Sequence, residues 1–312
     1  MSNNTDQSQL LCDRVKQACN DRIPLAITAG NSKAFYGRKV LGEPLSLTEH
    51  HGILSYKASE LVITARSGTL ISEIETVLEQ QHQQLAFEPP CHSNRATIGG
   101  AIACGLSGPA RAFSGAARDF VLGTKIINGK GEMMTFGGEV MKNVAGYDLS
   151  RLMAGALGTL GVLLDVSLKV LPKPEVEYTL TQVCSQAEAI TRFAEWLGKP
   201  LPLSAACWYD DHLHLRLSGS ESAVRQAQHR LGHPLDLLLP CSSVTGDRSL
   251  DRRRRVFPDL ETGALSSQQD HPTRLAELEH ALQVLAAEHL LDGQRVRAPP
   301  LDQGPHLLED QR

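Results

Sequence analysis

Glycine is concentrated in one stretch of this 312-residue chain. Fourteen of the 26 glycines lie between Gly99 and Gly161, at several separated points rather than in one turn. Glycine permits left-handed backbone conformations and lets other atoms approach the main chain closely. The chain must therefore fold so that several loops come close to each other or to a large ligand. Tight turns in a compact α/β core are the other explanation for any one of these glycines.

The charge of the same stretch indicates what kind of ligand it would bind. Between Pro89 and Arg118 there is no Asp or Glu, whereas Arg95 and Arg111 are present. Exposed backbone N–H groups and nearby cations together bind phosphate groups. We therefore expect a phosphate-bearing cofactor.

The composition excludes several classes of protein. The chain is 41% hydrophobic and 21% charged, as in globular proteins, and its net charge of -4 argues against nucleic-acid binding. Seven cysteines without a Cys-x-x-Cys pair predict free thiols in a reducing cytoplasm and no iron–sulfur or zinc framework. The polar N-terminus predicts no signal peptide, and no apolar run reaches the roughly 18 residues of a membrane span. Any membrane association is expected to come through partner subunits.

Three common cofactor and catalytic motifs are absent from the sequence. There is no Gly-x-Gly-x-x-Gly fingerprint, no Walker A loop and no Gly-x-Ser-x-Gly elbow. A tightly bound nicotinamide, an NTPase and a serine hydrolase are therefore disfavoured.

Hydrophobic periodicity predicts a mixture of helices and strands. The expected helices cover residues 10–20, 70–78, 148–157, 185–197, 220–231 and 275–289. The expected strands cover residues 23–28, 61–65, 120–127, 132–136, 162–171, 205–209 and 213–217. The sequence Asn128-Gly129 between two of these strands predicts a hairpin, which argues against a simple doubly wound sheet.

The first predicted strand leads into the loop Gly30-Asn31-Ser32-Lys33. This loop combines unhindered N–H groups, amide and hydroxyl donors and one cation, which together suit a pyrophosphate. The alternative is an ordinary strand-to-loop turn. His50 and His51 follow a leucine-rich turn further on, and we expect them on the surface.

Four blocks carry a family resemblance through their order and spacing: Thr97 to Gly100, Arg118 to Val121, Lys142 to Leu149 and Gly158 to Val162. The chain from about Pro24 to Gly219 resembles the FAD-binding domain of the flavoproteins that include vanillyl-alcohol oxidase and p-cresol methylhydroxylase (PCMH). It is more similar to their D-lactate dehydrogenase and glycolate oxidase branch, and to the FAD-binding subunits of bacterial glycolate oxidases in particular.

The resemblance implies an α+β fold with three parts. A PCMH-type FAD-binding domain of two α/β subdomains is expected over residues 1–174, up to Pro172 and Pro174. A small α+β cap is expected over residues 175–240. Residues 241–312 lack the strands and aromatic residues of the family pattern, so we expect a partly helical or disordered tail and leave open whether the cap is complete.

The resemblance also implies a non-covalently bound FAD, because no histidine for covalent attachment lies between Gly30 and Gly37. The pyrophosphate is expected on Gly30, Asn31, Ser32 and Lys33, with help from Ser107 and Gly108. The adenine and ribose are expected near Thr97, Ile98, Gly99, Gly100, Gly158, Thr159, Gly161 and Val162. Further contacts with the cofactor are expected from Pro89, Arg118, Asp119, Val121, Lys142 and Asn143.

Some of these residues have alternative roles. Lys142 could be a solvated surface charge, with Tyr147 and Asp148 capping the next helix. Arg118 and Asp119 could form an ion pair beside the cofactor. His212 and His214 would project from one face of a strand, either as a metal-binding pair or as two polar side chains, and we predict no metal site.

The function implied by the resemblance is that of an FAD-binding subunit in a glycolate oxidase-like complex. Its partners would be a catalytic flavoprotein subunit and an iron–sulfur subunit, and its substrate a 2-hydroxy acid, glycolate, which is oxidised to glyoxylate. Catalytic relatives hold metal and substrate with histidines around a Gly-Asp-Gly turn, which is absent here. No catalytic residue is therefore identified. A stand-alone FAD-dependent 2-hydroxyacid dehydrogenase and a non-catalytic structural subunit are the alternatives.

Overall fold

The computed structural model describes residues 4–138, 147–231 and 236–238. The chain divides into two compact units, Met1–Ser267 and Gln268–Arg312, and every described residue lies in the first. The predicted helix over residues 275–289 and the predicted tail over residues 241–312 lie outside the described residues.

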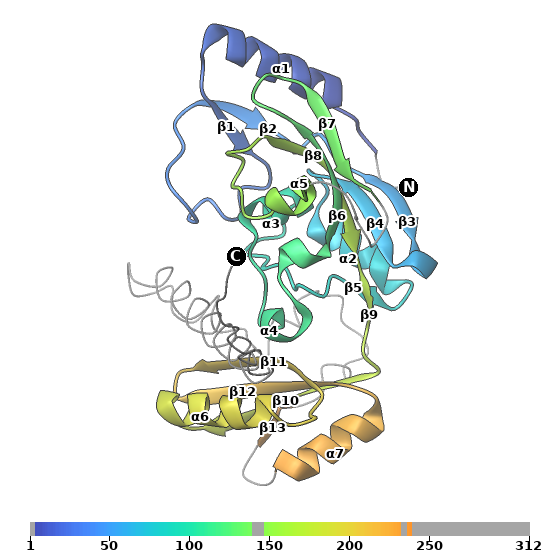
Figure 1. Ribbon diagram of the computed structural model, residues 1–312, viewed down its shortest axis with the longest axis vertical. Helices are drawn as coiled ribbons and strands as arrows, with labels where there is room; N and C mark the ends of the chain where they lie inside the picture. The colour runs from blue at the N-terminus through green and yellow to red at the C-terminus, as the bar shows by residue number, and fades with distance from the viewer. Residues whose placement is uncertain (1–3, 139–146, 232–235, 239–312) are drawn as a thin grey trace, which may run out of the picture. The chain divides into compact units, whose positions relative to one another are not determined.

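Helices and strands are mixed along the chain, which confirms the predicted α+β class (Figure 1). The helices are α1 (Ser8–Asp21), α2 (Ile71–Glu79), α3 (Ile98–Cys104), α4 (Arg111–Ser114), α5 (Leu149–Leu152), α6 (Gln186–Leu197) and α7 (Glu221–Leu231), with the 3-10 helices η1 (Ala58–Glu60) and η2 (Ala117–Phe120). The strands are β1 (Leu25–Thr28), β2 (Glu43–Ser46), β3 (Ile53–Lys57), β4 (Val62–Arg66), β5 (Gln83–Gln84), β6 (Val121–Ile127), β7 (Met133–Gly137), β8 (Val162–Lys169), β9 (Leu171–Pro172), β10 (Val176–Val183), β11 (Leu203–Tyr209), β12 (His212–Gly219) and β13 (Asp236–Leu238). None of the helices in the described ranges is both long enough and apolar enough to cross a bilayer.

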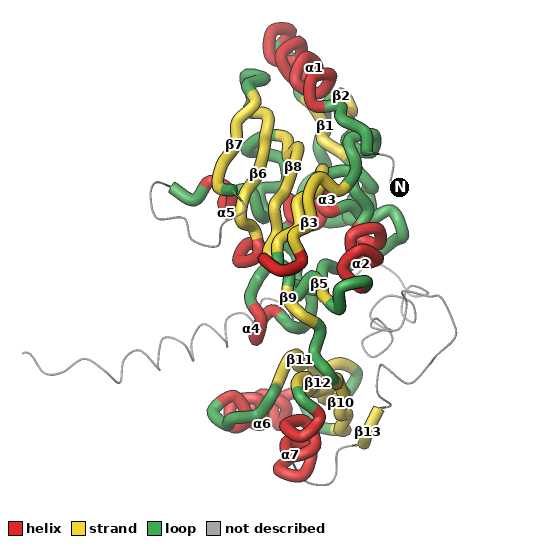
Figure 2. The backbone as a smooth tube through the Cα atoms, turned by 90° about the vertical axis from the view of Figure 1, so that its right-hand side faces the viewer, coloured by secondary structure: helices red, strands yellow, loops and turns green. Residues whose placement is uncertain are grey.

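A five-stranded antiparallel sheet in the order β3-β4-β8-β6-β7 forms the centre of the N-terminal part (Figure 2). Helices α2 and α3 pack against one face of it, where Leu163 points. On the other face, Leu164 packs with α1 and with the parallel pair β1–β2. Side chains alternate across a strand, so β8 contributes to both hydrophobic cores.

A second antiparallel sheet, in the order β11-β12-β10-β13, follows residue 175, and we call it with α6 and α7 the cap sheet. Leu213, Leu215 and Leu217 of β12 are fully buried against α6 and α7. The residues between them lie on the opposite face. Helix α6 begins at a capping box, in which Ser185 and Glu188 bond each other's backbone N–H groups.

Two predictions about local structure have different outcomes. The hairpin is confirmed, because β6 pairs with β7 through the turn at Asn128 and Gly129. The helix predicted over 148–157 is wrong beyond Leu152. Gly155, Leu157 and Gly158 have φ values of 84°, 52° and 76°, and such left-handed residues end a helix.

The prediction that His50 lies on the surface is wrong, because its side chain is fully buried. Its Nδ1 accepts the N–H of Gln7 at 3.1 Å, and its Nε2 lies 3.4 Å from a carboxylate oxygen of Asp165. Asp6 also pairs with Arg66 at 3.0 Å, and the Ser8 N–H, followed by Arg66, holds the pKa of Asp6 well below its usual range. The segment before α1 therefore buries His50, which the sequence around it predicted to be exposed.

We predict that Leu164→Ala lowers the free energy of unfolding by about 2 to 5 kcal/mol, because it leaves a cavity between the central sheet and α1. Urea unfolding followed by circular dichroism measures this loss. Leu10→Ala on the exposed side of α1, where Leu10 is 65% exposed, should change it by less than about 0.5 kcal/mol. Equal effects of the two substitutions would contradict the packing described for β8.

Candidate functional site

Helix α3 is where segments from distant parts of the sequence meet. The N–H of Gly155 donates to the carbonyl of Ile102 at 3.0 Å, and the N–H of Leu157 donates to that of Ala103 at 2.9 Å. These two bonds place the predicted block Gly158 to Val162 directly after a segment bound to the end of α3. The sequence predicted no helix at Thr97 to Gly100, yet the chain starts α3 there, with the Thr97 hydroxyl accepting the Gly100 N–H at 3.2 Å.

The loop that begins at Gly30 is held against the segment before α3. The Arg95 guanidinium donates to the carbonyl of Gly30 at 3.2 and 3.3 Å, and the rings of Phe35 and His92 meet edge to face with centroids 5.0 Å apart. A Cβ atom on Gly30 would lie 1.5 Å from the Arg95 carbonyl oxygen. Glycine is required here by contact within the protein itself, and Arg95 is a loop-holding residue rather than only a source of positive charge.

Lys33 is the most unusual residue of this loop, because only 8% of its surface is exposed. Cys91 and Cys104, the last residue of α3, are its electrostatic neighbours. Burial lowers the pKa of the Lys33 ammonium below its usual value, and the two cysteines oppose this effect. No carboxylate pairs with Lys33 anywhere in the described ranges. A buried cation without a counter-ion is suited to receive an anionic ligand.

The glycines of the predicted blocks divide into two kinds. A Cβ on Gly99 would lie 2.4 Å from the Cβ of Ser67, and one on Gly161 would lie 2.6 Å from the carbonyl oxygen of Ile127. These two glycines are explained by packing within the fold. A Cβ on Gly100 would meet only the Thr97 hydroxyl, at 3.2 Å, so this position leaves room for a ligand. Gly158 is intermediate, with the Ile27 side chain at 3.2 Å.

Four of the predicted site residues have buried apolar side chains: Pro89, Ile98, Val121 and Val162. Ile98 and Val121 belong to the core under α2 and α3, whereas Val162 belongs to the core under α1. Only their backbone groups remain for contact with a ligand.

Ser107 and Gly108 follow the end of α3. The Gly108 N–H donates to the carbonyl of Phe87 at 2.9 Å, and the Ser107 hydroxyl accepts the Ala117 N–H at 2.9 Å. The Ser107 hydroxyl can still donate its own proton to a ligand. Both residues follow within four positions of Cys104, an electrostatic neighbour of Lys33.

The remaining predicted residues lie at exposed positions or outside the described residues. Asn31 is exposed with φ 55°, Ser32 is half-buried, and the exposed Thr159 donates to the Ala156 carbonyl at 2.7 Å. Lys142 and Asn143 lie outside the described residues.

Asp119 and Asp148 each accept a hydrogen bond from a backbone N–H group. Asp119 accepts the Ala116 N–H at 2.9 Å, and among the described residues it forms no ion pair with the exposed Arg118, so that alternative is wrong. Asp148 accepts the Arg151 N–H at 3.0 Å and caps α5, as the alternative for the block Lys142 to Leu149 predicted. A contact of Arg118 with a ligand stays a prediction.

His212 and His214 lie on one face of β12, as predicted, with ring centroids 6.3 Å apart. Burial, followed by the charge of His212, lowers the pKa of His214, whose Nδ1 lies 3.1 Å from the Thr181 hydroxyl. In the part of the chain that the structure describes, no three His, Cys, Asp or Glu residues are arranged to hold a metal ion.

Sequence reasoning missed the partners that shape the site, namely Ser67, Cys91 and Cys104. Ser67 lies under Gly99, and its buried hydroxyl has no hydrogen-bond partner within the described part of the chain. Cys91 and Cys104 were considered only as free thiols. Both cysteines lie within the acid-free block, Cys91 before α3 and Cys104 at its end, and this placement was a usable signal.

The sequence of this chain is similar to those of known proteins. The sequence model of a family described as FAD binding domain matches residues 6–137. Glycolate oxidase subunit GlcE of Escherichia coli (strain K12) is 52% identical over 227 residues, which cover 73% of this chain and 65% of that protein. Glycolate oxidase subunit GlcD of Bacillus subtilis (strain 168) is 30% identical over 191 residues, which cover 60% of this chain and 39% of that protein.

A solved structure of alkyldihydroxyacetonephosphate synthase is similar with a TM-score of 0.60 at 15% identity, over 80% of this chain and 53% of that one. This likeness shows the fold alone. The chain spans less than two thirds of the length of each of these relatives. The family match over residues 6–137 confirms the predicted FAD-binding domain and FAD as its cofactor, and the 52% identity to a glycolate oxidase subunit bears out the predicted resemblance.

Proposed function

We propose that this chain is the FAD-binding subunit of a glycolate oxidase-like complex. Its partners in this proposal are a catalytic flavoprotein subunit and an iron–sulfur subunit, in the cytoplasm or at the membrane surface through those partners. The proposal keeps the division into a FAD-binding domain (1–174), a cap (175–240) and a tail (241–312). Similarity to the two glycolate oxidase subunits supports it.

The observation that carries the proposal is the buried ammonium of Lys33, which pairs with no carboxylate of the described residues. A pyrophosphate would supply the counter-charge that the described residues do not provide. Gly30, Asn31 and Ser32 would donate from the same loop, and Ser107 and Gly108 from beyond α3. The acid-free surroundings of α3 and the open position at Gly100 fit a dinucleotide.

The other predicted contacts remain part of the proposal. The adenine and ribose would lie near Thr97, Gly100, Gly158 and Thr159, with Ile98, Gly99, Gly161 and Val162 contributing backbone. Pro89, Arg118, Asp119, Val121, Lys142 and Asn143 complete the proposed set.

FAD, when bound, supplies an acceptor for the hydride of a 2-hydroxy acid. The described residues contribute binding and charge: Lys33 neutralises phosphate, and the loops around α3 exclude water from it. Oxidation of glycolate to glyoxylate also needs a base and a cation for the substrate carboxylate. Arg216 is the buried cation of the cap sheet, but two glutamates already pair with it. We therefore place the substrate step on the catalytic partner, which passes electrons to the iron–sulfur subunit.

The absorption spectrum of the purified chain is the first test. We expect flavin bands, no bleaching by glycolate with this chain alone, and bleaching when both partner subunits are present. Bleaching by the chain alone would favour a stand-alone 2-hydroxyacid dehydrogenase. If the protein contains no flavin even after incubation with FAD, the remaining explanation is a non-catalytic structural subunit.

We predict that FAD affinity falls as pH rises, because the ammonium form of Lys33 binds the pyrophosphate. The lowered pKa of unliganded Lys33 lies below the ordinary 10.5, and a bound anion raises it again. Binding therefore takes up a proton between these two pKa values, and the affinity falls there by up to about tenfold per pH unit. Fluorescence titrations with FAD measure this slope.

Lys33→Met should weaken FAD binding by about tenfold or more and remove this pH dependence. Lys130→Met in the exposed turn before β7 is the matched control and should leave both unchanged. A Lys33→Met protein with the wild-type pH profile would contradict this role of Lys33.

We predict that Gly100→Val lowers FAD affinity more than it lowers stability. Within the protein the new Cβ would approach only the Thr97 hydroxyl, at 3.2 Å, and valine and glycine differ in helix propensity by less than about 1 kcal/mol. Gly99→Ala should do the reverse, because its methyl group overlaps Ser67. Flavin content and thermal unfolding of both variants check this. A Gly100→Val protein with a full complement of flavin would show that the placement is wrong.

A further inference from the structure

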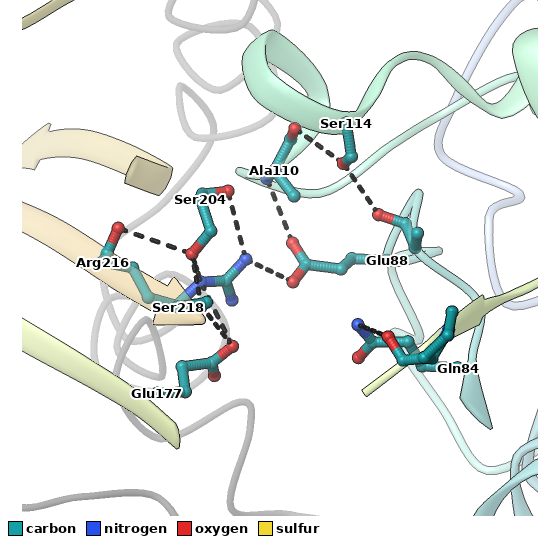
Figure 3. A network of polar contacts seen from close by, with 10 residues as sticks. Gln84, Glu88, Ala110, Ser114, Glu177, Ser204, Arg216 and Ser218 are labelled. Carbon is teal, nitrogen blue, oxygen red and sulfur yellow. Dashed lines mark hydrogen bonds and ion pairs between the residues drawn. The ribbon is translucent and has the colours of Figure 1, made fainter. Parts of the chain in front are cut away.

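Arg216 occupies a special position on the cap sheet. It lies on the face of β12 opposite to the leucines that pack on α6 and α7, and only 7% of it is exposed. Its Nε contacts residues of the cap sheet: it donates to the Ser204 hydroxyl at 3.1 Å and lies 3.7 Å from the Glu177 carboxylate. The terminal Nη2, by contrast, reaches Glu88, which lies in the loop after β5 (Figure 3). One side chain thus joins the cap sheet to the FAD-binding part.

Glu88 uses its two carboxylate oxygens in different directions. Oε1 accepts from Arg216 at 2.5 Å, and Oε2 accepts the backbone N–H of Ala110 at 3.1 Å (Figure 3). Its own backbone is left-handed with φ 47°, a conformation that a non-glycine residue keeps only when its surroundings hold it there. Burial raises the pKa of Glu88, and the Arg216 cation opposes this effect. Among the groups that favour the charged form of Glu88, Arg216 has the largest effect, ahead of the Ala110 N–H.

The segment that Glu88 holds carries two of the proposed phosphate contacts. A Cβ on Gly108 would lie 2.7 Å from the Cβ of Glu88, so Gly108 rests directly on this side chain. The same segment continues into α4, where Phe113 packs against the apolar core of the cap sheet and the Ser114 hydroxyl donates to the Ala86 carbonyl at 3.1 Å. Residues 107–114 are therefore fixed from both sides, by Glu88 and by the cap.

We infer that Arg216 is a positioning residue for the flavin: through Glu88 it sets the position of residues 107–110, so that the cap sheet controls FAD affinity without touching the cofactor. This inference rests on the proposed function. It also explains why Arg216 is not a receptor for a substrate carboxylate, since two glutamates already share its charge.

The test compares FAD dissociation constants of purified full-length variants with their unfolding temperatures. Arg216→Met leaves the Glu88 carboxylate partly buried without a cation and should raise the dissociation constant about tenfold or more. Glu88→Gln keeps an acceptor for the Ala110 N–H and should raise it less. The double variant should bind FAD better than Arg216→Met alone, because position 88 then no longer holds a carboxylate without its cation. Arg216→Lys should restore part of the affinity.

Arg225→Met on α7 is the matched control. Arg225 forms an exposed pair with Glu221 on its own helix, and its loss should leave FAD binding unchanged. All dissociation constants are measured well below the unfolding temperature of each variant, so that a loss of stability alone cannot change them. If Arg216→Met does not fold, the FAD dissociation constants of Glu88→Gln and the wild type are compared instead. Equal values would then overturn the inference.

Three outcomes would overturn these proposals. If wild-type protein binds no FAD, the proposed function fails and the inference fails with it. If wild-type protein binds FAD and folded Arg216→Met binds it equally well, only the inference fails. If Arg216→Met keeps its FAD affinity but, with both partner subunits present, loses the glycolate-induced bleaching that the wild type shows, Arg216 is a substrate receptor instead.

Discussion

Burying an ammonium group without a carboxylate beside it costs free energy of folding. Lys33 is buried in this way among the described residues, and the structure around it has to compensate. A surface loop would normally let such a side chain turn to solvent. Here Arg95 holds the loop at Gly30, and the end of α3 and Cys91 enclose the lysine. The arrangement is reasonable for a protein that spends its time with an anion bound, and a dinucleotide phosphate is the anion that the domain family binds.

The fold serves this constraint by packing α3 closely on the central sheet. Gly99 admits Ser67 where a side chain would collide, and the carbonyls of Ile102 and Ala103 receive the N–H groups of the segment before Gly158. Loops from three parts of the sequence are thus fixed to one short helix. The cap sheet is attached to the segment after α3 through Glu88, which accepts the Ala110 N–H. The cation that pairs with Glu88 is Arg216 of the cap sheet.

Much of this could be read from the sequence, and the failures have physical causes. Hairpins and amphipathic helices are local, so β6–β7 and α6 were predictable from turn residues and periodicity. The family blocks predicted the FAD-binding domain. The burial of His50 was not predictable, because it depends on a segment more than 40 residues away that covers it. Likewise, the sequence does not distinguish the adjacent Gly99 and Gly100. They differ only in packing: a Cβ on Gly99 would collide with Ser67, whereas one on Gly100 would approach only the Thr97 hydroxyl.

A crystal structure of the chain with FAD tests the central claim most directly. The account predicts the pyrophosphate oxygens within about 3.2 Å of the Lys33 ammonium, with the loop at Gly30 and the end of α3 on either side. FAD bound elsewhere, with Lys33 still enclosed and unpaired, would contradict it.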